Sequence, residues 1–228
     1  MGVTVKPRGR PRRVAVDELR TRALDAAAAL VAERGFGALT ISAVAARTGV
    51  DRSAIYEQFG SLDDLVAAAS ARALDEFRTT LLDAVAVSAD PPPHDLVATR
   101  VDAMLALHER RPDDAALIAA VEREGAPALR RRVADAKGAV LAEFTAIRKE
   151  AWTLPADAPV HSLEILTAMH WGMLESVVAA WRTNPGWDRA HIVELLTEFT
   201  VAGYAWLYLQ RPELLLEPAD RGTTRGTP

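Results

Sequence analysis

The sequence of 228 residues has no cysteine and no long apolar run. Without cysteine, disulfide scaffolds, zinc–thiolate sites and thiol nucleophiles are excluded. No stretch approaches the roughly 18 uncharged apolar residues that a membrane span needs, and no apolar segment of a secretory signal follows the basic N-terminus. We therefore expect a cytoplasmic protein with no membrane partner, long enough for one large domain or two small ones.

Segments typical of β-strands are also scarce. Ala, Leu, Glu and Arg dominate, and apolar residues recur at spacings of three and four, which predicts helices along most of the chain. The expected helices cover 17–34, two short stretches between 40 and 59, 63–87, 94–111, 113–125, 127–152, 161–183 and 188–211. The predicted fold class is all-α, with about nine helices in total.

The net charge of −4 is unevenly distributed. Residues 1–60 hold ten Lys and Arg against six Asp and Glu, a balance of +4, and the remainder has a balance of −8. Because a protein that binds nucleic acid must neutralise phosphates with Lys and Arg, this asymmetry makes the N-terminal segment the candidate for such a partner.

Within that segment, residues 41–59 have the composition that two short crossing helices need. Gly49 stands where the chain must adopt a positive φ to turn sharply between them. Thr40 and Asp51 are suited to cap the first and second helix, and Ala45 is small where the helices approach each other. The side chains expected in the small core between them are Val44, Val50 and Ile55.

Several polar residues of the second helix lie in its N-terminal half or on its outer side, where they can meet a DNA major groove. They are Arg52, Ser53, Tyr56 and Gln58. An ordinary helical hairpin is the alternative that these two helices alone leave open.

From Asp17 to Arg211 the chain resembles the TetR family of transcriptional regulators. The matching positions are Thr40, Val44, Ala45, Thr48-Gly49-Val50, Ile55-Tyr56, Phe59, Ser61 and Leu65, after a helix that ends Glu33-Arg34-Gly35-Phe36. The resemblance implies an all-helical homodimer, with a three-helix DNA-binding domain and a larger domain that binds an effector and dimerises. It implies that Thr40 and Tyr56 bind phosphates, that residues 52–58 read bases and that Phe59 is core.

Two positions depart from the family's usual pattern. Gln58 stands where a histidine is common, and Leu62 stands where a lysine often holds a phosphate at the start of the next helix. Without that lysine, one interaction that releases a counterion is missing. Part of the affinity for DNA must then come from elsewhere.

Residues 6–13 offer such a source, because five of these eight residues are Lys or Arg, and Gly9 and Pro11 disfavour a helix. Their Gly-Arg-Pro core resembles the AT-hook, whose arginines enter a narrow A·T minor groove. A solubilising tail is the alternative. The complete set of expected DNA-binding residues is Arg8, Arg10, Arg12, Arg13, Thr40, Ser42, Arg52, Ser53, Tyr56 and Gln58.

The last two long helices are apolar on more than one face, so one face belongs to the core and the other is expected to pack against a second copy of the chain. By resemblance, residues 161–211 form the homodimer interface, where Gly172 and Gly203 permit close approach. A core helix of a monomer is the alternative.

Large apolar side chains of the C-terminal part are candidates for the lining of an effector cavity, although each is also a plausible core residue. They are Met104, Phe144, Trp152, Met169, Trp171 and Trp181. That a pocket exists is implied mainly by the family, and its ligand is expected to be a small, largely apolar molecule.

The sequence predicts no catalytic residue, no cofactor and no metal site. His161 and Glu164, like His191 and Glu194, have a spacing that metal ligands use on a helix, but no additional carboxylates complete either pair. No nucleophile triad, phosphate-binding loop or dinucleotide motif is visible, so an enzyme is not expected.

These inferences divide the chain into a basic flexible arm (1–16), a helix-turn-helix DNA-binding domain (17–62), a helical ligand-binding and dimerisation domain (63–212) and a disordered tail (213–228). The predicted function is that of a homodimeric transcriptional repressor that a small effector releases from a double-stranded DNA operator. The alternative is a ligand-independent DNA-binding protein controlled by a protein partner.

Overall fold

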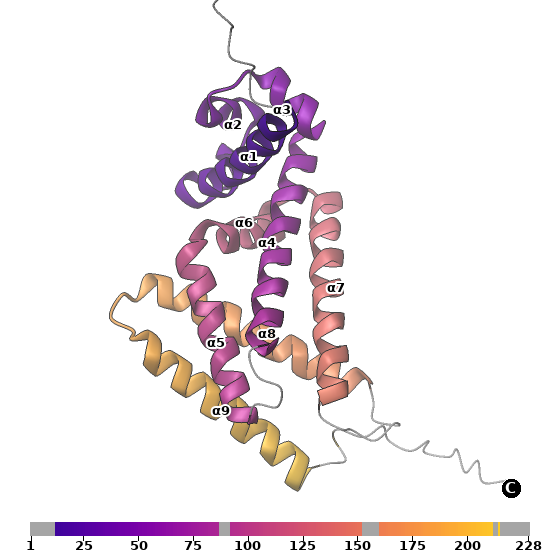
Figure 1. Ribbon diagram of the computed structural model, residues 1–228, viewed down its shortest axis with the longest axis vertical. Coiled ribbons are helices and arrows are strands. Elements are labelled where there is room, and N and C mark those ends of the chain that lie inside the picture. Colours follow the sequence, from indigo (N-terminus) through magenta and orange to yellow (C-terminus); the bar gives the residue numbers. More distant parts are fainter. Residues whose placement is uncertain (1–11, 87–91, 152–159, 212–213, 215–228) are drawn as a thin grey trace, which may run out of the picture. The chain divides into compact units, whose positions relative to one another are not determined.

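The computed structural model describes residues 12–86, 92–151, 160–211 and 214. In these residues it contains nine α-helices, one short 3-10 helix and no strand (Figure 1), which confirms the predicted all-α class. The elements are α1 (Arg12–Arg34), η1 (Phe36–Ala38), α2 (Ile41–Thr48), α3 (Arg52–Phe59), α4 (Leu62–Ala86), α5 (Pro93–Arg110), α6 (Pro112–Glu124), α7 (Pro127–Ala151), α8 (Val160–Thr183) and α9 (Arg189–Gln210).

Most helix boundaries lie within one or two residues of the predicted ones, and α1 is the exception. It begins at Arg12, five residues before the expected start at Asp17. The last part of the expected flexible arm, from Arg12 to Val16, is therefore helical. Proline is tolerated at the start of a helix, because the N–H group that it lacks has no intrahelical partner there. Pro11 consequently does not prevent a helix from Arg12 onward.

The helices pack into two units. The first unit comprises the chain up to Glu76 together with Arg110–Ala136, and the second unit comprises Phe77–Glu109 together with the chain from Lys137 onward. Helix α6 and the start of α7 thus belong with the N-terminal helices, whereas we expected one boundary after residue 62. Leu117 and Val121 of α6 are fully buried in the core of the first unit, and such long-range packing leaves no local signal in the sequence.

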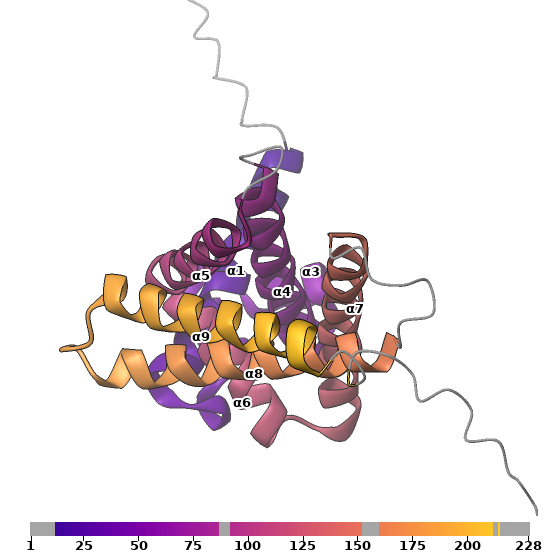
Figure 2. The same ribbon diagram turned by 90° about the horizontal axis from the view of Figure 1, so that it is seen from below.

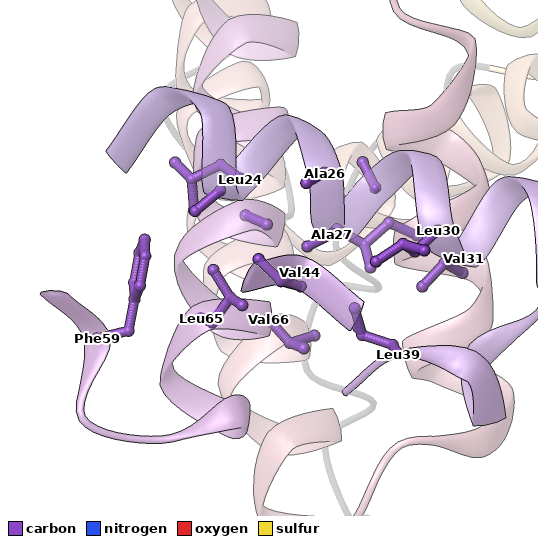
Figure 3. Packing of buried hydrophobic residues seen from close by; sticks show 14 of the residues in the cluster. Leu24, Ala26, Ala27, Leu30, Val31, Leu39, Val44, Phe59, Leu65 and Val66 are labelled. Carbon is purple, nitrogen blue, oxygen red and sulfur yellow. The ribbon is translucent and has the colours of Figure 1, made fainter. Parts of the chain in front are cut away.

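The core of the first unit forms around the apolar stripe of α1, which packs against α2 and α6. Ala23 and Ala27 are completely buried, and their small side chains allow other helices to approach the α1 backbone. Figure 3 shows this cluster, with α1 on one side and residues of the following segments on the other. Its labelled members are Leu24, Ala26, Ala27, Leu30, Val31, Leu39, Val44, Phe59, Leu65 and Val66.

A network of ion pairs also joins helices of the first unit. Arg72 of α4 lies 2.8 Å from Asp25 of α1 and 3.6 Å from Asp114 of α6. Arg111 reaches the same two carboxylates at 3.2 and 2.9 Å, and Glu76 at 3.6 Å. Because both arginines are mostly buried, water screens these pairs less than it screens pairs on an open surface. The network therefore links α1, α4 and α6 by charge as well as by apolar contact.

The second unit contains a small apolar cluster shared by α5, α8 and α9. Its buried members are Val101, Leu105, Leu174, Val178, Ile192 and Leu196. The helices α8 and α9 form an antiparallel hairpin (Figure 2). Arg189, at the start of α9, holds this hairpin to α5 through Asp102 and Glu109, each at 2.7 Å. None of the helices described is both long and apolar enough to cross a lipid bilayer.

Candidate DNA interface and effector cavity

The segment from Thr40 to Gly60 forms a helix-turn-helix whose local geometry follows from its sequence. The hydroxyl oxygen of Thr40 accepts a hydrogen bond of 3.1 Å from the backbone N–H of Ala43, which caps α2. Gly49 ends α2 with φ 70° and ψ 33°, the left-handed conformation that glycine adopts most easily. Asp51 precedes α3 in an extended conformation, but its side chain makes no capping hydrogen bond.

The two short helices separate apolar and polar residues cleanly. Val44 and Ile55 are completely buried, and Ala45 and Phe59 are nearly so, as expected for core residues. Val50 is partly buried against the same cluster. On the opposite side of α3 the exposed residues are Arg52, Ser53, Tyr56 and Glu57, and Tyr56 is 52% exposed. An aromatic side chain so open to solvent on a short helix is available to a partner.

Thr40 and Ser42, the expected contacts at the start of α2, are exposed as well. Since Thr40 uses its oxygen as an acceptor for the cap, its hydroxyl hydrogen is still available to donate to a phosphate. Gln58 is only half-exposed, so it is less accessible than Arg52, Ser53 and Tyr56, the other expected contacts on α3. Of the arm, Arg12 and Arg13 fall on the first turn of α1, whereas Arg8 and Arg10 lie outside the described residues.

The start of α4 explains one departure from the family pattern. Leu62 is half-buried and packs against the core cluster, so this position contributes apolar contact instead of a cation. The helix is capped by Ser61, whose hydroxyl oxygen accepts from the backbone N–H of Asp64 at 3.0 Å. The same hydroxyl donates to the Asp64 carboxylate at 2.6 Å. Hydrogen bonds from Ser61 and Arg132 lower the pKa of Asp64.

Two arginines near the helix-turn-helix were not among the predicted contacts. The guanidinium of Arg20 lies 5.2 Å from the centre of the Phe59 ring, which holds a cation beside the end of α3. Arg47 instead makes two hydrogen bonds to Glu33, of 2.7 and 2.6 Å, and these bonds lower the pKa of Glu33. Arg20 is therefore a further candidate for a phosphate contact, and the basic charge that continues into α1 was the signal for it.

The second unit contains a partly open pocket of about 500 Å³, which we call the cavity. Five helices, α4, α5, α7, α8 and α9, contribute to its wall. Its aromatic side is formed by Phe77, Phe144 and Trp171, with the centres of Phe77 and Trp171 4.2 Å apart. The aliphatic lining residues are Leu81, Leu96, Val97, Ile147, Leu174, Val201, Ala205 and Leu209. A volume of this size is typical of sites that bind small organic ligands.

A few polar residues interrupt this apolar wall. They are Arg100, Thr167, His170, Thr200 and Tyr204. The Thr145 hydroxyl donates to that of Thr167 at 3.2 Å. The hydroxyl of Thr200 and the indole N–H of Trp171 are buried and have no hydrogen-bond partner within the described part of the chain.

The structure brings only some of the predicted ligand-binding residues to the cavity. Phe144 and Trp171 line it. Met104 is buried away from it, and Met169 is 64% exposed on the outer side of α8. Trp181 packs against the cluster of α5, α8 and α9 and donates its N–H to the carbonyl of Trp187 at 3.1 Å. Trp152 lies outside the described residues.

Arg100 is the cavity residue that the sequence could have identified. It stands between Val97 and Val101 in an otherwise apolar row of α5. Arginines are mostly exposed in proteins, so an arginine on an otherwise apolar helical face is a candidate for a specific contact.

Large apolar side chains are also exposed in a row along α8 and another along α9. Their exposed fractions are 60% for Ile165, 64% for Met169, 56% for Leu195, 70% for Phe199, 53% for Trp206 and 69% for Leu209. The spacings of three, four and seven residues place each row on one face of its helix. Together the two rows form an uncovered apolar surface, which we call the hairpin face.

The described parts of the chain contain no cluster of three or more side chains that could hold a metal ion. His191 Nδ1 lies 3.9 Å from a carboxylate oxygen of Glu194, but no third His, Asp or Glu joins them within those parts.

The fold and the helix-turn-helix together define a class of protein, the all-helical transcriptional regulators with an N-terminal DNA-binding domain. Residues 23–69 match the model for bacterial regulatory proteins of the tetR family. The chain thus carries a TetR-family DNA-binding domain and is a DNA-binding transcriptional regulator. No curated protein matches it.

Solved structures share its fold at low sequence identity. The fatty acid degradation regulator FadR of Bacillus halodurans has 18% identity and a TM-score of 0.68, with 87% of this chain and 98% of that one covered. The regulator FadR of Bacillus subtilis, in complex with stearoyl-CoA, has 17% identity and a TM-score of 0.66, covering 80% and 98%. A TetR-like regulator from Rhodococcus sp. RHA1 has 22% identity and a TM-score of 0.64, covering 86% and 99%.

Proposed function

We propose that the protein is a cytoplasmic, homodimeric repressor that a small and largely apolar effector releases from its operator. The observation that carries this proposal is the cavity of about 500 Å³ inside the helical second unit, with walls that are mainly aromatic and aliphatic. A DNA-binding protein controlled only by a protein partner has no need for such a space, because an empty apolar cavity weakens the packing of a domain.

DNA is bound by the first unit. Arg52 and Ser53 of α3 read bases in the major groove, and Thr40 and Tyr56 hold phosphates on either side of it. The exposure of all four side chains supports these roles. Arg20 adds a phosphate contact from α1, and the basic residues that precede α1 supply the electrostatic attraction that Leu62 does not.

A second copy of the chain covers the hairpin face. Six large apolar side chains more than half exposed are unfavourable in water and favour an interface. On the same hairpin, no described atom lies within 4 Å of a Cβ placed on Gly172 or Gly203, so a partner can approach the helix backbones there. The resulting two-fold symmetry matches a pseudo-palindromic operator with half-sites on successive turns.

The effector occupies the cavity of the second unit. Since the regulator from Bacillus subtilis was solved with stearoyl-CoA, acyl chains are the first class of effector to test. Release from DNA requires that the effector bind more tightly to the form that does not fit the operator. Its affinity for free protein must therefore exceed its affinity for the protein–DNA complex.

The test begins with the selection of genomic fragments that the purified protein binds, followed by titration of the best fragment in a gel-shift assay. Acyl compounds are then added at fixed protein and DNA concentrations. We expect bound DNA to be released by compounds that fill the cavity, and we expect Phe144→Arg, which places a charge in the cavity wall, to bind DNA but no longer respond. Binding to DNA that no cavity-filling compound alters would favour control by a protein partner.

A further inference from the structure

We propose that Glu57 of α3 reads a cytosine of the operator, by accepting a hydrogen bond from the cytosine amino group in the major groove. This inference rests on the entry of α3 into that groove proposed above and adds a residue that determines base specificity. It concerns a carboxylate on the exposed side of the helix-turn-helix, where an acidic group and the phosphates of DNA repel each other.

The position of Glu57 on α3 is the first observation. Ile55 and Phe59 are the buried residues of this helix, and Glu57 stands two positions from each of them. Because two positions correspond to a rotation of about 200° around an α-helix, Glu57 lies on the side opposite to both. Ser53, one turn earlier, shares that side, and both side chains are exposed. Glu57 therefore projects away from the core of the first unit.

The second observation is that Glu57 has no role within the fold that would explain its charge. Its carboxylate makes no hydrogen bond or ion pair with the part of the chain that the structure describes. No Lys or Arg stands three or four positions before or after it, so the pairs that stabilise a helix surface do not form. It also lies in the last turn of α3, where the helix dipole disfavours a negative charge. The carboxylate is thus free for a partner outside the chain.

The surroundings of Glu57 indicate which part of DNA it meets. It is the single acidic residue in α2 and α3. Groups suited to phosphates lie nearby, because Tyr56 is 52% exposed and the guanidinium of Arg20 lies 5.2 Å from the centre of the Phe59 ring. Phosphates form the rims of the major groove, and base edges form its floor. With Tyr56 and Arg20 at the rims, the side of α3 opposite to its buried residues faces the floor.

A carboxylate distinguishes base edges because it can only accept hydrogen bonds. In the major groove, guanine presents two acceptors, and thymine presents one acceptor beside a methyl group, so neither base offers a donor. Adenine presents a donor next to the acceptor N7, which repels the second carboxylate oxygen. Cytosine presents its N4 amino group with no acceptor beside it on the same base, and Glu and Asp pair with this group. Cytosine is therefore the base that fits Glu57.

The experiment selects binding sites for the full-length protein from a library of randomised double-stranded DNA. Fluorescence anisotropy then measures the affinity for the consensus duplex and for duplexes that carry each of the other base pairs at one position. We expect one position at which cytosine is preferred over adenine by about fivefold to 100-fold, the effect of one good base contact.

The variant Glu57→Gln connects that preference to one side chain. An amide has nearly the same shape as the carboxylate but donates as well as accepts, which is the combination that N6 and N7 of adenine require. We expect the variant to lose the preference for cytosine at that position and to prefer adenine there, while the preferences at all other positions stay unchanged. The Tm should not fall, because Glu57 has no partner in the described part of the chain.

Asp135→Asn is the matched control for the loss of charge. Asp135 is exposed on α7 within the first unit and, like Glu57, has no partner among the described residues. The substitution removes one negative charge from the same unit but not from α3. It should leave every base preference unchanged, so any uniform change in affinity that it causes reports charge alone.

Three results would overturn the proposal. If Glu57→Gln changes the affinity for all sequences by a common factor and shifts no base preference, Glu57 meets phosphates or solvent and not a base. If the shift occurs at a position where the wild-type protein does not prefer cytosine, the assignment of the base is wrong. If the wild-type protein selects no sequence from the library, the entry of α3 into the groove fails as well, and this result is distinguishable from the other two.

Discussion

In the first unit, buried side chains from α1, α2, α3, α4, α6 and the start of α7 fill one core, and alanines such as Ala23 and Ala27 bring the helices close together. In the second unit, five helices surround a cavity of about 500 Å³, and two of them expose large apolar residues. The first unit thus buries its apolar side chains in one core, whereas the second unit leaves a mainly apolar pocket open and apolar surface exposed.

This difference corresponds to what we propose that each unit binds. A helix that reads base edges must keep its side chains in place to within a fraction of an ångström, and a filled core provides that rigidity. A unit that admits a small molecule needs a vacant volume, and a unit that dimerises needs an apolar face. The contrast leads to five predictions, in order of decreasing effect.

The hairpin face should tolerate no charge if a second copy covers it. Phe199→Asp is expected to convert dimers to monomers and to weaken operator binding by roughly 100-fold or more, since the two DNA-binding units no longer act together. Sedimentation equilibrium and gel-shift titration measure the two effects. Ala190→Asp is the control, because it adds the same charge at an exposed position on the opposite side of α9. A Phe199→Asp dimer that still binds its operator normally would refute the interface.

Substitution of an isoleucine by alanine should lower the free energy of unfolding by different amounts in the two units. Ile55 is completely buried in the first unit, so Ile55→Ala should lower the free energy of unfolding by about 2–5 kcal/mol. Ile147 is half-buried at the wall of the cavity, and Ile147→Ala should cost only about 1 kcal/mol, since it already lacks neighbours on one side. Urea denaturation followed by circular dichroism compares them. Equal decreases would mean that the second unit is as well packed as the first.

Base reading should depend on the exposed side of α3. Arg52→Ala is expected to reduce discrimination at one operator base pair by about 1–3 kcal/mol, measured by competition among operator variants. Arg130→Ala removes an equally exposed arginine from α7 and should leave discrimination unchanged. If both variants weaken all sequences equally, Arg52 contacts phosphate and not bases.

The basic residues before α1 should act through charge alone. Because α1 begins at Arg12, a Gly/Ser segment in place of residues 1–11 leaves the helix intact while removing Lys6, Arg8 and Arg10. Operator affinity should fall, and the slope of its logarithm against log salt should decrease by about 0.9 for each phosphate that the protein no longer neutralises. Gel-shift titration at several salt concentrations measures this. An unchanged slope would mean that these residues do not bind DNA.

The smallest expected effect is a pH-dependent change in Tm that a histidine of the second unit causes. Hydrogen bonds to Asp95 and Glu198, at 3.4 and 3.2 Å, raise the pKa of His94. The stabilisation of the fold by protonated His94 is thus fully present below the ordinary histidine pKa of about 6.5. It disappears as the pH rises through the raised pKa. His94→Gln should therefore lower the Tm slightly at about pH 6 and not at about pH 8. A difference that grows with pH would contradict this assignment.

The helices and the helix-turn-helix could be predicted because their signals are local. Apolar spacing defines a helix, Gly49 has the left-handed φ that the turn requires, and Thr40 caps the helix that follows it. Each depends on residues within a few positions of one another. The predicted start of α1 was wrong by five residues, because Pro11 permits a helix from the next residue onward and does not exclude one.

The cavity depended on packing that no local pattern reveals. Phe144, Met169 and Trp171 are similar as apolar residues in the sequence, yet Phe144 and Trp171 line the cavity and Met169 faces outward. Arg100 and Thr200 lie a hundred positions apart and contribute to one wall. Residue type and spacing were sufficient to predict the helices and the turn between α2 and α3, because backbone hydrogen bonds and caps are short-range. Only the tertiary structure decided which side chains surround empty space, because that depends on how five helices pack at once.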